Sequence, residues 1–247
     1  MKKLTLIAAV AIMTFLFSGC MQMHMDSTIE KDGSGSMSMT MSLSKVLTES
    51  LDDLKSMDMG EDMGGVDMMM DMDKDELQKQ VKEYGVKVKT FEKSLVEGRQ
   101  TVNVVMEFKD LEGLSYAMHA LTQDDGGGLG FTDNGDGTFT LEPHEYVWPA
   151  VVEEAEEEEE EMAMPDMDPE AMGKQMEVMG KLMSSISELD ISMKITVPGD
   201  IVESNAPKVE GRTSIWTING SNMMTAGGDM EPHITFQGKG LKLKATK

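Results

Sequence analysis

The chain has a single cysteine, Cys20, which lies at the end of an apolar stretch near the N-terminus. A thiol can be acylated, oxidised or bound to a metal, but one cysteine cannot form a disulfide within the chain. Lys2 and Lys3 precede residues 4–17, which are apolar except for two threonines. This layout is typical of a secretory signal, and it is too short to span a hydrocarbon core of about 30 Å. We therefore predict a signal peptide over residues 1–19, with Cys20 as the first residue of the mature chain.

The run Phe17-Ser18-Gly19-Cys20 resembles the lipobox of bacterial lipoproteins, although leucine is commoner at its first position. The resemblance implies that the Cys20 thiol carries a diacylglyceryl group and that the new N-terminus receives a further acyl chain. Two or three chains hold a protein firmly on a membrane, whereas one chain binds marginally. A secretory signal that merely contains a cysteine is the alternative. Met21 follows where inner-membrane lipoproteins of enterobacterial type often carry aspartate, which favours the outer membrane if the host is Gram-negative.

Methionine is unusually frequent, with 28 residues against 18 leucines. Its thioether is a soft ligand that suits copper or silver, and its flexible side chain also fills cores in place of leucine. The methionines of 21–25, 37–41 and 172–183 follow a buried period, so we predict that they are core residues. Segment 57–73 is a glycine- and aspartate-rich loop without periodicity, and soft-metal binding or sacrificial oxidation there is the alternative function. Its methionines are Met57, Met59, Met63, Met68, Met69, Met70 and Met72.

Signatures of catalysis are missing from the sequence. The histidines lie in unlike contexts, and there is no nucleophile elbow, zinc-binding helix or phosphate loop. Asp133 and Asp136 lack the spacing of a calcium loop, and residues 71–75 are followed by glutamate where that loop requires glycine. We therefore expect no enzymatic activity, no cofactor and no metal site, and a tight hairpin turn at 131–139. The four histidines are His24, His119, His144 and His233.

The chain is strongly acidic, with a formal net charge of −23 at pH 7. Such a surface repels nucleic acid and anionic lipid headgroups, which excludes a nucleic-acid partner. The stretch from Glu153 to Glu161 contains eight glutamates and one alanine. Like charges at this density repel one another and bury nothing, so we predict that residues 150–167 form a flexible acidic insertion. An acidic tail for a cationic partner is the alternative.

Hydrophobic periodicity predicts both strands and helices. Alternation predicts one hairpin over 21–43, with a turn at 31–35, and a second over 86–108. Helix caps and apolar stripes predict helices after Ser44, near Asp75, after Asp110 and over 168–186. Further strands are expected at 191–197, 213–218 and 234–236, and a last one near 241–243. We therefore predict an α+β fold, a largely antiparallel sheet with several helices, in which 20–149 and 168–247 form one lipid-anchored domain around the acidic insertion.

The strand after Cys20, the glycine-rich turn and the run 197–206, followed by Gly211 and Trp216, resemble bacterial lipoproteins of the LppM type. The resemblance covers residues 20–45 and 189–218, and it implies a fold and a location rather than an activity. This chain ends in a polar segment, whereas some relatives end in an apolar one. The motif also has a physical reading, since Pro198-Gly199 ends a strand, Asn205 holds a turn and Trp216 is a large core or interface anchor.

These features together predict a membrane-anchored bacterial lipoprotein with a non-catalytic binding or structural role in the cell envelope. The membrane is the one partner that the sequence indicates, through acyl chains on Cys20. The alternative is a methionine-rich envelope protein that binds copper or silver through segment 57–73.

Overall fold

The computed structural model leaves three sequence features outside its described part: the predicted signal peptide, most of segment 57–73 and the acidic insertion 150–167. The described residues are 20–55, 70, 72–96, 98–122, 127–146, 173, 176–178, 180–181, 184, 188–222 and 231–246.

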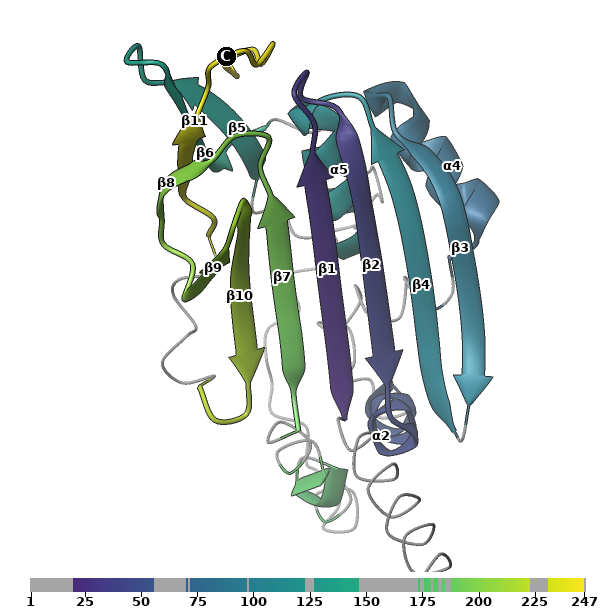
Figure 1. The fold of residues 1–247 in the computed structure, drawn as a ribbon. Helices are drawn as coiled ribbons and strands as arrows, with labels where there is room; N and C mark the ends of the chain where they lie inside the picture. The colour runs from purple at the N-terminus through teal and green to yellow at the C-terminus, as the bar shows by residue number, and fades with distance from the viewer. Residues whose placement is uncertain are drawn as a thin grey trace, which may run out of the picture.

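The larger of two sheets has seven strands in the order β3-β4-β2-β1-β7-β10-β9 (Figure 1). Neighbouring strands are antiparallel except β1 and β7, which run parallel. Both predicted hairpins are present, as the pairs β1–β2 and β3–β4. The strand that follows Cys20 is therefore central in the sheet. The strands are β1 (Met21–Ile29), β2 (Gly35–Leu43), β3 (Lys87–Val96), β4 (Arg99–Phe108), β7 (Asp190–Thr196), β9 (Lys208–Glu210) and β10 (Thr213–Asn219).

The smaller sheet has four antiparallel strands in the order β5-β6-β11-β8. Its strands are β5 (Gly128–Asp133), β6 (Thr138–His144), β11 (Ile234–Gln237) and β8 (Ile201–Ser204). Phe131, Phe139 and Phe236 pack their rings together on this sheet, with centroids 5.8 to 6.3 Å apart. The smaller sheet thus has its own aromatic centre, which joins the core of the larger one.

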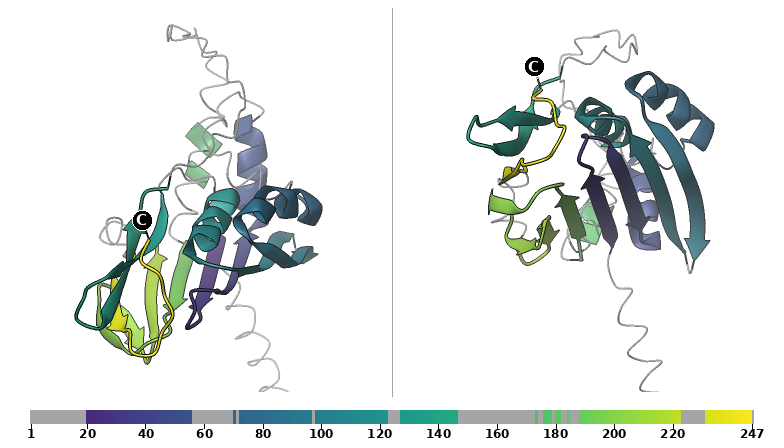
Figure 2. Two further views of the ribbon diagram at one scale, coloured as in Figure 1. Left: turned by 90° about the horizontal axis from the view of Figure 1, so that it is seen from above. Right: turned by 45° about the horizontal axis from the view of Figure 1, so that its top comes forward.

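Helices α4 (Lys74–Val81), with the 3-10 turn η3 (Lys82–Tyr84), and α5 (Leu111–Thr122) cover one face of the larger sheet, and α2 (Lys45–Lys55) lies at the end of β2, as Figures 1 and 2 show. Each has a side-chain cap: Ser44 accepts from Leu47 N–H at 3.2 Å, Asp73 from Glu76 N–H at 2.9 Å, and Asp110 from Gly113 N–H at 3.0 Å. The three predicted helix starts are confirmed to within a residue or two.

The core lies between the helices and the sheet, and methionines form its central row. Met39 faces Met25 across β1 and Val104 across β4. Met25 faces Met193 of β7, which in turn faces Trp216 of β10. This row crosses five strands, and all its members are buried. The opposite face of the same strands carries short polar side chains, as expected for an antiparallel sheet with one solvated face.

The predicted α+β class is wrong, because the described chain is mostly β. The second sheet is what the sequence did not indicate. Strand β11 was predicted at 234–236, but β8 and β9 have only four and three residues, too few for alternation to reveal them. The partners of β11, which are β6 and β8, lie far away along the chain, so no local turn signal marks their pairing in a second sheet. The described positions inside the predicted helix 168–186 are helical, but that helix lies mostly outside the described residues.

The predicted strand near 241–243 is also wrong. Residues 241–246 have no strand pairing and instead bridge two hairpins. The Lys242 N–H donates to the Lys31 carbonyl at 2.8 Å, and the Thr246 N–H donates to the Phe131 carbonyl at 2.8 Å. Single bonds to separate segments do not make a ladder, although they tie the C-terminal residues to both sheets. Among the described residues, no helix is both long and apolar enough to cross a membrane.

Candidate functional site at the Cys20 end of the sheet

Cys20 lies where β1, β2 and α2 meet. Its carbonyl accepts a 2.7 Å bond from the Ser44 N–H, which extends the β1–β2 ladder by one residue pair beyond Met21 and Leu43. Ser44 then caps α2, so one residue closes the ladder and starts the helix. The Cys20 side chain is 5% exposed and packs in an apolar cluster with Leu43 and Leu47. The residue predicted to carry lipid therefore has an ordered, apolar surrounding.

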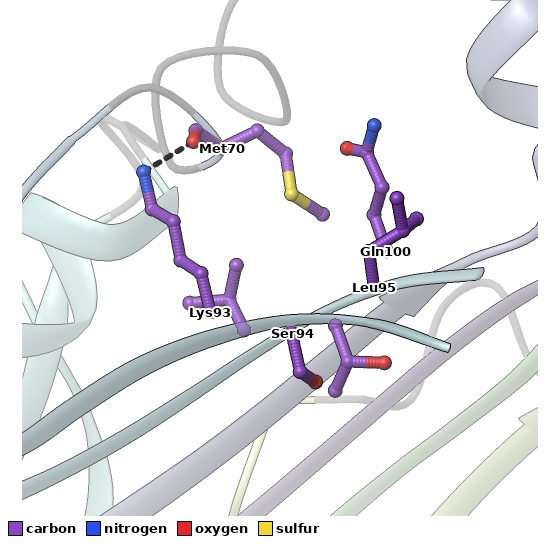
Figure 3. A pocket seen from close by; sticks show the side chains of 7 residues that line it. Met70, Lys93, Ser94, Leu95 and Gln100 are labelled. Carbon is purple, nitrogen blue, oxygen red and sulfur yellow. Dashed lines mark hydrogen bonds between the residues drawn. The ribbon is translucent and has the colours of Figure 1, made fainter. Parts of the chain in front are cut away.

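An open groove of about 280 Å³ lies at the same end of the sheet, on its helix-covered face. Its lining residues are Met70, Lys93, Ser94, Leu95, Gln100, Thr101 and Val102. Figure 3 shows the Met70 thioether between Lys93 on one side and Gln100 and Leu95 on the other. Leu95 is 69% exposed, which is unusual for so large an apolar side chain. The sequence did not single out this groove, because its walls come from three separate segments.

A second hollow, of about 490 Å³, separates α2 from Lys181. Its walls carry the carboxylates of Glu49, Asp52 and Asp53. Lys181 pairs with Glu177 at 2.9 Å on its own helix, and this bond with the nearby negative charge raises the pKa of Lys181. Exposed ion pairs of this type contribute little to stability. The hollow is a solvated charged surface, and we assign it no ligand.

The methionines of β1 and β2 are core residues, as predicted. Met37, Met39 and Met41 are buried, and Met21 and Met23 pack against the same core from partly buried positions. A thioether in a packed core has no open side from which to bind an ion.

Two methionines of segment 57–73 pack against the core, although the sequence predicted a loop without a buried period there. Met72 is 3% exposed and belongs to the main core, so packing does explain this residue. Met70 packs against both the main core and the Cys20 cluster. The other methionines of the segment lie outside the described residues. Within the described part, no group of three or more histidine, cysteine, aspartate or glutamate side chains is arranged to hold a metal ion.

The four histidines occupy four different places. His24 bonds to Ser192 at 2.7 Å on the polar face of the larger sheet, and His119 packs near Tyr116 on α5. The His144 ring packs edge-on against Tyr146, and His233 lies 3.7 Å from Glu142. Among the described residues, none of these contacts joins one histidine to another.

The aspartates of the β5–β6 turn hold the turn itself, as predicted. Asp133 accepts from the Gly135 N–H at 3.0 Å, and Asp136 accepts from the Thr138 hydroxyl at 2.6 Å and its N–H at 3.0 Å. The bond from the Thr138 hydroxyl is the main cause that lowers the pKa of Asp136. Gly135 and Gly137 both have positive φ, which the reversal requires.

The run 197–206 carries the chain from one sheet to the other. β7 of the larger sheet ends at Thr196, and β8 of the smaller sheet begins at Ile201. Between them, the Asp200 carbonyl accepts from Gln237 N–H at 2.9 Å, which attaches the crossing to β11. Asn205 clamps a distant segment instead of holding a local turn, since its side chain bonds to His233 N–H at 3.0 Å and the Glu231 carbonyl at 2.8 Å. The motif thus has a structural role.

Trp216 is confirmed as a core anchor, at 1% exposure. Its indole N–H has no hydrogen-bond partner in the described part of the chain.

The comparison with solved structures returns the folded domain of LppM from Mycobacterium tuberculosis, determined by NMR. This chain is similar to it over 89% of its own length and 90% of that domain, at 12% identity and a TM-score of 0.43. The similarity is to the family that the sequence resemblance named, and it supports no statement about activity or site residues. No protein-family model and no curated protein matches the chain.

Proposed function

We propose that this protein is a lipoprotein of the bacterial cell envelope, held on a membrane by acyl chains on Cys20. One observation carries the proposal: the single cysteine ends an apolar leader, and the first strand of the fold begins one residue later. The folded domain thus starts where the anchor would end, with no spacer between them. The charge of −23 opposes binding to anionic headgroups, so the acyl chains would supply the attachment.

The role of the domain, in this proposal, is binding or structural and not catalytic. The histidines are dispersed, and the acidic turn residues hold their own backbone. The outer membrane is the proposed site if the host is Gram-negative, since Met21 follows the cysteine in place of aspartate.

Replacement of the anchor residue tests the proposal. Cells that express the full chain should incorporate labelled palmitate into the protein, and the protein should sediment with membranes. Cys20→Ser and Cys20→Ala should both abolish labelling and leave the chain unprocessed or released from the membrane. The alanine variant controls for a hydroxyl placed in the apolar cluster of Leu43 and Leu47. Palmitate incorporation that survives both substitutions would exclude an anchor on Cys20.

A further inference from the structure

The groove beside β3 and the apolar cluster around Cys20 are continuous through one residue. Met70 packs against the cluster formed by Cys20, Leu43 and Leu47, and it also lines the groove. Its thioether lies over the groove floor in Figure 3. Met70 therefore connects the buried cluster at the predicted acylation site with the groove that Leu95 lines.

Strand register sets the distance between the two ends of this surface. Met21 faces Leu43, Leu43 faces Gln100, and Gln100 faces Leu95, all on the same face of the sheet. Three steps between neighbouring strands separate Met21 from Leu95, or about 14 Å. A long-chain acyl group attached at the adjacent Cys20 is long enough to cover this distance.

Two polar side chains of the groove, Lys93 and Thr101, have partners within the protein. The Lys93 ammonium donates to the Met70 carbonyl and lies 5.6 Å from the centroid of the Phe91 ring, which leaves its hydrocarbon stem along the groove. The Thr101 hydroxyl pairs with Ser42 at 2.9 Å. Beside the Gln100 amide and the Ser94 hydroxyl, the groove offers a ligand hydrocarbon surface, above all the exposed Leu95. This chemistry suits an uncharged chain better than a charged headgroup.

We propose that one acyl chain of the Cys20 anchor lies in this groove, against Met70, Leu95 and Val102. The inference rests on the proposed acylation of Cys20. A chain held there covers Leu95 and places the β3–β4 hairpin tip next to the membrane. The anchor then fixes the orientation of the domain, in addition to holding it at the surface.

Thiol protection tests the occupant of the groove. Acylation blocks Cys20, so Leu95→Cys supplies the one free thiol of the acylated chain, and in the Cys20→Ser chain it is again the one thiol. Val46→Cys is the matched control, because Val46 is 51% exposed on α2 at the same end of the molecule but does not line the groove. Each full chain is mixed with phosphatidylcholine vesicles and treated with a water-soluble maleimide, and mass spectrometry confirms acylation.

We expect acylation to slow labelling of Leu95→Cys at least about tenfold and to leave labelling of Val46→Cys nearly unchanged. Tenfold corresponds to about 1.4 kcal/mol, which burial of roughly two methylene groups supplies. Equal rates at position 95 with and without acylation would overturn the inference. Equal slowing of labelling at both positions would also overturn it, because this result indicates shielding by the membrane. Protection of position 95 in the Cys20→Ser chain would overturn it too, because this result indicates a lipid from the vesicle. Failure of acylation itself would instead contradict the proposed function.

Discussion

Gly199 lies against the backbone of Gln237, the last residue of β11. A Cβ at position 199 would stand 1.9 Å from the Gln237 carbonyl oxygen and 3.1 Å from the Phe236 ring. The sequence explained Pro198-Gly199 as the end of a strand, which is correct for β7, but it gave no sign of this contact with a residue far along the chain. Trp216, in contrast, was predicted correctly, because its size alone favours burial.

Gly199→Ala should therefore lower the free energy of unfolding by about 1–3 kcal/mol, the usual cost of an extra methyl group where backbone must move to admit it. Urea denaturation of the mature chain measures this. Gly180→Ala is the matched control, since Gly180 is helical and exposed, with no other atom within 4 Å of its added Cβ. It should keep or slightly raise stability. A similar loss in both variants would show that crowding at Gln237 is not the cause.

At the scale of elements, local sequence patterns predicted the hairpins and helices correctly, but they did not predict which distant strands pair. The β1–β2 hairpin followed from alternation around a glycine-rich turn, and α4 followed from its apolar stripe of Leu77 and Val81, both fully buried. The parallel pairing of β1 with β7 joins residues about 170 positions apart, such as Met25 and Met193. Alternation shows which face of a strand is buried, but it does not identify the strand's neighbour. The sequence therefore did not predict the division into two sheets.

The N-cap of α4 gives a prediction for this element. The Asp73 carboxylate accepts from the N–H groups of Glu76 and Asp75, and the bond from Glu76 is the main cause that holds its pKa below the ordinary 3.8. Asp73→Ala leaves both donors without this acceptor and should lower the melting temperature at neutral pH by about 2–4 °C, typical of one lost cap in a chain of this size. Scanning calorimetry of the mature chain measures the shift.

The pH dependence of that shift has a definite sign. Because folding lowers the pKa of Asp73, the carboxylate stabilises the fold above the unfolded-state pKa, and this contribution is lost as pH falls through the lower folded-state pKa. The difference between wild type and Asp73→Ala should thus shrink from about pH 5 to about pH 1. Asp73→Asn keeps an acceptor without a titrating charge and should retain most of the stability at all pH values. A constant difference across this range would contradict the assignment.

At the scale of the whole molecule, the candidate site combines one residue that the sequence identified with several that it did not. Cys20 was evident from its uniqueness and its place after an apolar run. The groove was not, because Met70, Leu95 and Val102 come together only when β3, β4 and the segment before α4 assemble. Leu95 also gave no signal, since an apolar residue in a strand is expected to be buried.

The last prediction concerns whether residues 20–149 and 168–247 form one domain, as the sequence analysis expects. β1 has β2 on one side and β7 on the other, so the centre of the larger sheet needs both parts of the chain. Residues 20–149 alone would expose one edge of β1 and lose the contacts of Met25 with Met193 and of β6 with β11. We expect this fragment to show no cooperative thermal transition by circular dichroism.

The control is the mature chain without residues 153–161, which retains every described strand and should change in unfolding free energy by no more than about 0.5 kcal/mol. Cooperative unfolding of the fragment at the temperature of the mature chain would instead place a domain boundary between the two parts, since strand pairing across it would then contribute little to stability.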